Sequence, residues 1–125
     1  LTALGEHALP ADPDGAAWRG LAFDGSVWWA GLGERVFRLV SMDSPQVGFE
    51  TAGPVTGLAA DREARRLFTS EADRICQYRL DGVCAACWYP PEERISAGGI
   101  AWDGHELWLV DPEGSQVLQT RPDLP

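Results

Sequence analysis

One short phrase recurs three times along the chain and constrains its architecture more than any other feature. It reads Gly-Leu-Ala-Phe-Asp from Gly20, Gly-Leu-Ala-Ala-Asp from Gly57 and Gly-Ile-Ala-Trp-Asp from Gly99, so the copies start 37 and 42 residues apart. Each copy is followed by a second and then a third short apolar run. A recurrence of about 40 residues is typical of repeat proteins, in which every copy folds into one supersecondary unit.

The apolar runs have the composition of β-strands rather than helices. They are short, rich in β-branched and aromatic residues, and bounded by Gly, Asp and Pro. The dipeptides that begin at Asp24, Asp81 and Asp103 each place Gly after Asp, which suits tight turns with positive φ. No apolar spacing of the helical kind persists along the chain. The sequence therefore predicts an all-β fold.

A fourth run completes the first two repeats, at residues 46–51 and 83–89. A four-stranded repeat of this length is the blade of a β-propeller. We predict blade 1 at residues 17–54, blade 2 at 55–93 and blade 3 at 94–125, with blade 3 lacking a fourth strand of its own. Residues 1–10 are predicted to be a closing strand that completes the last blade.

Three blades are fewer than the roughly four to eight of known rings. We therefore expect a homodimer in which residues 1–10 of each chain complete blade 3 of the other. Two chains would then close a six-bladed ring with twofold symmetry, the commonest symmetry of soluble oligomers. The alternative is that the chain is a fragment of a longer propeller.

The net charge of the chain limits the classes of partner that it can bind. The formal net charge is −9, and all ten basic residues are Arg. A nucleic-acid partner needs a basic footprint, so we predict no nucleic acid, and by the same reasoning no anionic membrane surface. The sequence holds neither Lys nor Asn, which excludes a Schiff-base lysine and an asparagine metal ligand. No apolar run approaches the length of a membrane span.

The segments from Gly20 to Ala30 and from Gly99 to Asp111 resemble the blades of NHL-type, SMP-30-like and glutaminyl-cyclotransferase-like propellers. The resemblance runs from about Trp18 to Arg121 and implies the propeller fold. These families include lactonases, cyclotransferases and pure interaction modules, so the resemblance does not select one function. SMP-30-like lactonases hold a divalent metal with Glu, Asp and Asn. Because this chain has no Asn, we predict no metal site of that type.

Ligands of propellers generally bind at the top of the ring, where two sets of loops surround the central channel. Here these loops are residues 10–17, 51–56 and 90–98 in one set, and 31–35, 71–74 and 111–116 in the other. They are rich in acidic residues, which could attract a cation or a basic partner, although solvated loops are often charged without any ligand. The side chains that we predict to bind at the channel top are Trp18, Arg19, Thr56, Glu71 and Asp111. We predict no catalytic set and no cofactor.

The three cysteines lie close together in the sequence, in and beside a Cys-x-x-Cys motif. Counting outward from the turn at Asp81 places Cys76 opposite Cys87, in a hydrogen-bonded pair, and Cys84 opposite Arg79 on the other face of the sheet. This arrangement disfavours a disulfide and breaks up any cluster of three thiols. We therefore predict buried free thiols rather than a metal or redox site.

Two functions remain. The first is a non-catalytic binding or scaffold propeller, assembled from half-propeller chains, with a small molecule or a basic partner at its central channel. The second is a propeller enzyme of the cyclotransferase or lactonase type, with channel carboxylates as acid and base. A bound metal, or a channel carboxylate with a raised pKa, would distinguish the enzyme.

Overall fold

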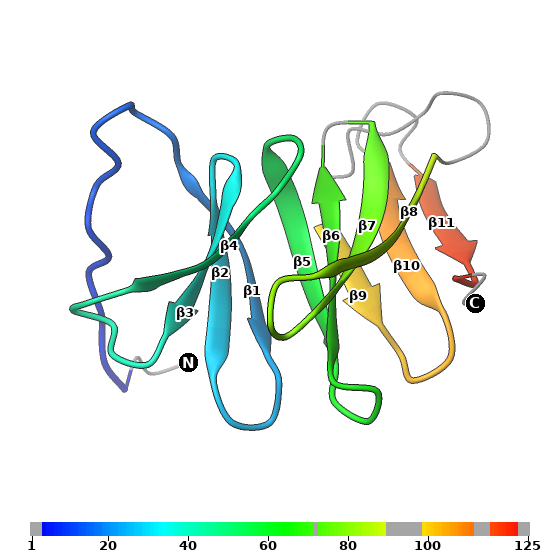
Figure 1. Cartoon of the computed structure of the whole chain (residues 1–125), viewed down its shortest axis with the longest axis horizontal. Helices are drawn as coiled ribbons and strands as arrows, with labels where there is room; N and C mark the ends of the chain where they lie inside the picture. Colours follow the sequence, from blue (N-terminus) through cyan, green and yellow to red (C-terminus); the bar gives the residue numbers. More distant parts are fainter. Residues whose placement is uncertain (1–3, 72, 90–98, 112–115, 123–125) are drawn as a thin grey trace.

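The computed structural model describes residues 4–71, 73–89, 99–111 and 116–122, apart from the side chain of Asp111. These residues form three antiparallel sheets that stand side by side (Figure 1), which we call blade 1, blade 2 and blade 3 in chain order. The all-β prediction is therefore confirmed. Within the described ranges no helix is long and apolar enough to cross a membrane.

The strands of each blade follow one another in space in the order of the chain. Blade 1 consists of β1 (Trp18–Phe23), β2 (Trp28–Leu32), β3 (Arg35–Leu39) and β4 (Gln46–Glu50). Blade 2 consists of β5 (Val55–Asp61), β6 (Arg66–Glu71), β7 (Arg74–Arg79) and β8 (Cys84–Trp88). Blade 3 consists of β9 (Gly99–Trp102), β10 (Leu107–Asp111) and β11 (Gln116–Thr120).

The first strands of the blades adjoin, because β5 contacts both β1 and β9. The blades therefore fan out from a line of inner strands. One hydrophobic core fills the seam between blades 1 and 2 and includes Trp29, Phe49, Leu58 and Leu67. A second core fills the seam between blades 2 and 3, where Phe68 packs with Leu107 and Leu109 among others. Blade 2 thus has a covered apolar face on each side.

The repeated aspartate is a structural turn residue, as its recurrence predicts. Asp24 accepts hydrogen bonds from the amides of Ser26 and Val27, at 2.7 and 2.8 Å, and from the indole Nε1 of Trp29, at 2.8 Å. Burial alone would raise the pKa of Asp24, but the bonds from Trp29 and the two amides outweigh it and lower this pKa. The following Gly25 has φ 103°, as the turn prediction requires.

Blade 3 repeats this turn with the same atoms. Asp103 accepts from the amides of His105 and Glu106, at 2.8 and 2.7 Å, and from the indole of Trp108, at 2.8 Å. The bonds from Trp108, Glu106 and His105 lower the pKa of Asp103 to about 2. Blade 2 replaces the indole by a guanidinium: Arg66 Nε lies 2.8 Å from Asp61 Oδ2 in a buried ion pair.

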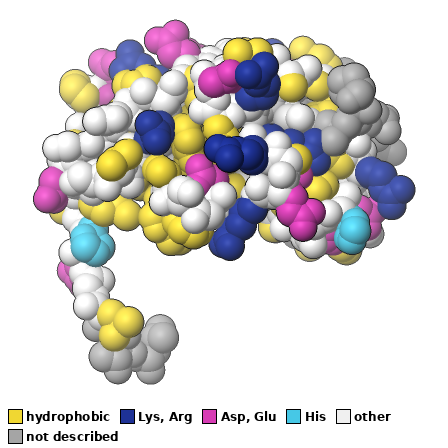
Figure 2. Space-filling model, turned by 60° about the horizontal axis from the view of Figure 1, so that its bottom comes forward, with side chains coloured by type: hydrophobic (Ala, Val, Ile, Leu, Met, Phe, Trp, Pro, Cys, Tyr) yellow, Lys and Arg dark blue, Asp and Glu magenta, His cyan; other side chains and the backbone are white. Residues whose placement is uncertain are grey.

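The N-terminal residues leave the body of the molecule as an extended arm, which we call the N-terminal arm (residues 4–9; Figure 2). The arm forms no strand, and Leu4 is fully exposed. Within the described residues β11 pairs only with β10, so its other edge is free. Among the described residues, the N-terminal arm therefore does not pair with β11 of its own chain.

Candidate functional site

Trp18 and Arg19 begin the inner strand of blade 1. The Trp18 ring is half-buried and packs edge-on against Phe37, with ring centroids 5.1 Å apart, and its indole Nε1 donates to the carbonyl of Pro10 at 2.8 Å. The Arg19 side chain is exposed. Trp18 therefore holds the segment before blade 1 against β3, in addition to any contact with a ligand.

A cleft of about 450 Å³ lies beside Trp18. Residues 10–14 and 16 line this cleft together with the end of β2, the turn residue Glu34 and the first residue of β3, Arg35. Two of the predicted top-face loops, residues 10–17 and 31–35, therefore meet at this cleft. A volume of this size is within the range of small-molecule sites.

Thr56 occupies the position in β5 that corresponds to Arg19 in β1. It lies where the pairing of β5 with β6 shifts by one residue. Its hydroxyl contacts Ser70 Oγ at 2.8 Å and the carbonyl of Ser70 at 3.2 Å. No side-chain hydrogen bond or ion pair within the described residues joins Thr56 to Trp18, Arg19 or Glu71, so the described side chains of these four predicted binding residues are not linked into one hydrogen-bonded cluster.

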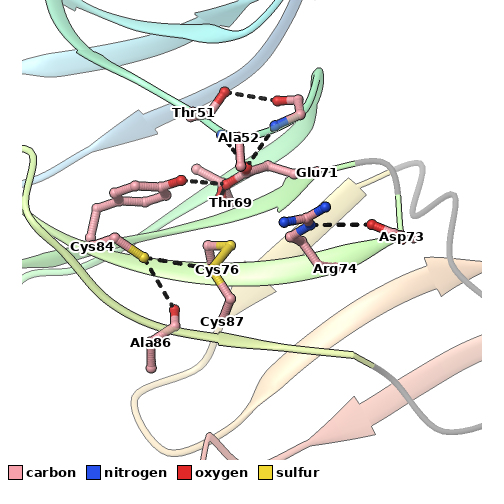
Figure 3. Close-up of a disulfide and its surroundings, with 12 residues drawn as sticks. Thr51, Ala52, Thr69, Glu71, Asp73, Arg74, Cys76, Cys84, Ala86 and Cys87 are labelled. Atoms are coloured by element: carbon pink, nitrogen blue, oxygen red, sulfur yellow. Dashed lines mark hydrogen bonds and ion pairs between the residues drawn. A yellow bond between two sulfur atoms is a disulfide. The ribbon is translucent and has the colours of Figure 1, made fainter.

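Glu71 lies at the end of β6 rather than in a loop, and its side chain is completely buried. Its carboxylate accepts from the amides of Ala52 and Gly53, at 3.0 and 3.2 Å, and from the hydroxyls of Thr69 and Tyr78 (Figure 3). Glu71 therefore ties the connection between blades 1 and 2 to the core of blade 2. The sequence predicts Glu71 in the loop of residues 71–74 because the second apolar run ends at Ser70, and the partners that bury Glu71 are far away in the chain.

The same carboxylate affects its neighbours. Burial, the hydrogen bond to Glu71 and the charge of Glu71 together raise the pKa of Tyr78 well above its usual range. Partial burial and the charge of Glu71 raise the pKa of the Cys84 thiol. Tyr78 is therefore a neutral hydrogen-bond donor throughout the physiological pH range.

The remaining predicted position, Asp111, is the last residue of β10, and its side chain lies outside the described residues. Most of two top-face loops, residues 90–98 and 112–115, also lies outside them. The predicted acidic loops at the channel top are therefore described by the structure only in blades 1 and 2.

The two end blades each present an apolar face that sequence reasoning did not resolve residue by residue. On blade 1 a cross-strand row of Leu21, Ala30, Phe37 and Val47 faces away from blade 2, with Leu21 57% and Val47 53% exposed. On blade 3 the outward side chains include those of Trp108, Val110 and Val117, which are all exposed. The alternation of strand residues assigned these side chains to one face or the other, but only the packing shows which face is covered.

The cysteine predictions are wrong in two respects. Cys76 does lie opposite Cys87, as predicted, but the two form a disulfide, with Cα atoms 4.1 Å apart. Cys84 is an exposed free thiol, and it pairs with Tyr78 instead of Arg79. Its Sγ lies 3.5 Å from Cys87 Sγ, on the same side of the hairpin (Figure 3).

A bulge in β8 explains both errors. The register shifts between Gln77 and Tyr78, which leaves Ala85 as an extra residue in β8. Near the turn, Arg79 donates to the carbonyl of Val83, so this is a hydrogen-bonded pair. Alternation through the bulge then makes the pair of Cys76 with Cys87 a non-hydrogen-bonded one, whose Cα atoms lie close together. The extra residue also turns Cys84 toward the other two cysteines.

No family model matches the sequence, and a search among curated proteins gives no match. Solved structures do resemble it. A chain of the nidogen/laminin complex superimposes with a TM-score of 0.64 at 20% identity, over 88% of this chain and 51% of that one. Virginiamycin B lyase from Staphylococcus aureus matches with a TM-score of 0.64 at 12% identity, over 95% and 45%. A gluconolactonase from Xanthomonas campestris matches with a TM-score of 0.62 at 17% identity, over 89% and 43%.

The fold is that of a β-propeller. This confirms the resemblance to propeller repeats read from the sequence. The chain spans about half the length of the propeller structures that it matches. At these identities the likeness shows the fold alone, and the structures include both a complex of interacting proteins and enzymes.

Proposed function

We propose that the chain is a non-catalytic half-propeller that pairs with a second copy to close a ring and binds a small molecule or a basic partner at the shared axis. The observation that carries the proposal is the open apolar face at each end of the fan of blades. Leu21 and Val47 on blade 1, and Val110 and Val117 on blade 3, are about half exposed or more. Large exposed apolar side chains that share one face of an end blade indicate an interface.

The interior seams show what such faces pack against. Trp29 and Val36 of blade 1 are buried against blade 2, whereas Leu21 and Val47 of the same blade point the other way and are exposed. A blade with one covered and one open apolar face lacks a neighbouring blade. A second copy supplies that neighbour twice, because blade 1 of each chain would pack on blade 3 of the other in a closed, twofold-symmetric arrangement.

The N-terminal arm and the free edge of β11 support a second copy in particular. An unpaired strand edge is a template for another strand. The arm makes no strand in its own chain and carries Leu4 in full contact with solvent. A strand exchanged between the copies would place the arm on β11 of the partner. Three blades, spanning about half of the matched propellers, correspond to six blades in the closed ring.

The proposal is tested by the mass of the protein in solution, measured by light scattering over a wide range of concentration. We expect twice the 13.6 kDa of one chain. Leu21→Arg and Val110→Arg place a charge on the two end faces and should each give folded monomers. Val83→Arg is the matched control, because Val83 is equally exposed but lies in the turn between β7 and β8.

Two results would overturn the proposal. A wild-type protein that is monomeric at every concentration would show that the missing blades come from elsewhere, as in a fragment of a longer propeller. A dimer that survives both face variants would show that these faces are not the interface. Deletion of residues 1–9 then tests separately whether the N-terminal arm is exchanged onto β11 of the partner. We expect the shortened chain to fold normally but to form weaker dimers.

The matched lyase and gluconolactonase favour an enzyme as the second candidate. Against this, the two buried carboxylates among the described residues, Asp61 and Glu71, are already bound by donors of the chain itself. An assay of lactone hydrolysis distinguishes the candidates. Turnover that scales with protein concentration and disappears in Leu21→Arg would establish the enzyme, whereas the binding proposal expects none.

A further inference from the structure

All three cysteines of the chain converge at one place. Cys76 lies on β7, and Cys84 and Cys87 lie on β8. Their three Sγ atoms lie within 4.8 Å of one another, and those of Cys84 and Cys87 are 3.5 Å apart (Figure 3). We call this cluster the three-cysteine site. It is unrelated to the end faces and the arm that carry the proposed assembly.

The backbone register brings the three thiols to one face of the sheet. Residues three apart on a regular strand point to opposite faces, so Cys84 and Cys87 would diverge. The extra residue Ala85 restores them to one face, opposite Cys76. Cys76 forms the buried floor of the site, while Cys84 and Cys87 lie at the solvent side. The site is therefore closed toward the core and open toward water.

Three converging thiolates are ligands for soft metal ions such as Zn²⁺. With zinc–sulfur bonds of about 2.3 Å, the sulfur atoms of a tetrahedral site lie about 3.8 Å apart. The 3.5 Å between the Sγ atoms of Cys84 and Cys87 is close to that value, and opening of the disulfide frees the Sγ atoms of Cys76 and Cys87 to move apart. In the disulfide state Cys76 and Cys87 have no thiolate to offer, and Cys84 alone is a poor ligand set.

We propose that the three-cysteine site is a reduction-gated site for one soft cation of the Zn²⁺ class. Two equivalents of a thiol reductant supply two electrons and two protons: the bond between Cys76 and Cys87 breaks, both become thiols, and the reductant leaves as its own disulfide. Binding of the cation then displaces the three thiol protons to solvent. A water molecule takes the fourth, solvent-facing position, as in sites with three protein ligands.

Either state of the site links the same two strands. The disulfide joins β7 to β8 directly, and the cation joins them through Cys76, Cys84 and Cys87. Opening the disulfide therefore need not free β8, the outer strand of blade 2, provided that a cation is present. The site would report both the thiol redox state of its surroundings and the supply of soft metal.

The test measures Zn²⁺ binding to the full chain by competition with a chromophoric chelator, with reductant removed under anaerobic conditions. We expect one tightly bound Zn²⁺ per reduced chain and none per oxidised chain. Co²⁺ in place of Zn²⁺ should give thiolate-to-metal absorption and the visible bands of tetrahedral coordination. Cys84→Ser keeps the disulfide of the oxidised protein, so its fold can be verified, and its reduced form should bind Zn²⁺ at least about tenfold more weakly.

Val83→Ser is the matched control, because it adds a hydroxyl to the neighbouring residue and should leave the Zn²⁺ affinity unchanged. Equal binding by the oxidised and reduced wild-type protein would overturn the proposal, since the ligands would then be surface carboxylates. Equal binding by reduced wild type and Cys84→Ser would also overturn it. So would one Zn²⁺ per two chains with a mass that doubles only when Zn²⁺ is added, because the cation would then bridge exposed thiols of different molecules.

Discussion

The buried carboxylate of Glu71 offers the sharpest test of how blades 1 and 2 are joined. Replacement by Ala removes the acceptor for four donors: two backbone amides in the connection between the blades, and the hydroxyls of Thr69 and Tyr78. If the carboxylate is a structural clamp, the free energy of unfolding should fall markedly. If it is a ligand-binding group instead, binding should fall while stability remains.

The size of the expected loss follows from the burial of each donor. Ala52 is exposed, so water can replace the carboxylate at its amide. Gly53, Thr69 and Tyr78 are buried, and each would keep a donor without a partner. A buried unsatisfied donor costs about 1–3 kcal/mol, and the two hydroxyls can recover part of this by rotating toward other acceptors. We therefore expect Glu71→Ala to destabilise the protein by about 3–5 kcal/mol.

The measurement is urea unfolding followed by tryptophan fluorescence, at one fixed protein concentration because assembly would contribute to stability. Tyr78→Phe is the matched control: it removes one donor but leaves the carboxylate with three, and should cost about 0.5–1.5 kcal/mol. Should Glu71→Ala itself fail to fold, Glu71→Gln keeps the shape of the side chain and should lie between the two. A loss of less than about 0.5 kcal/mol for Glu71→Ala would refute the clamp.

Two further predictions concern the seam between blades and the repeated turn. A Cβ added at Gly31 would lie 2.5 Å from Val55 Cγ1, so Gly31→Ala should destabilise the protein by about 1–3 kcal/mol in urea unfolding, whereas Gly99→Ala meets no atom within 4 Å and should be nearly neutral. The lowered pKa of Asp103, about 2 against about 3.9 when unfolded, means that its carboxylate stabilises the turn above about pH 4 and that this contribution is lost as the pH falls through about 2. The indole N–H resonance of Trp108 should therefore shift with a midpoint near pH 2, and a midpoint near 4 would contradict the assignment.

Sequence reasoning succeeded where the structure depends on neighbours in the chain. The turns at Asp24 and Asp103 were predictable because each carboxylate binds amides two and three residues ahead. Glu71 was misplaced because its partners lie up to 19 residues away, on the connection between two blades. Among the candidate binding residues, Trp18 was placed correctly at the start of an inner strand, but its contact with Pro10 was not visible in the repeat.

The three-cysteine site was missed because of a bulge that recurs between the outer two strands of both complete blades. Counting outward from a turn gives the facing residues only while both strands advance together, and one extra residue reverses the face of every side chain beyond it. Both complete blades break this condition in the same places: the register shifts between their first and second strands and between their third and fourth strands, never between the second and third. The shift in β8 is therefore a property of the blade rather than an accident near the cysteines. A repeat that places a bulge in its outer strand pair converts a Cys-x-x-Cys motif with diverging thiols into one whose thiols converge. The inner strands, which the repeated phrase identifies, determine the fold, and the chemistry of this chain is expected where the outer strands depart from regular pairing.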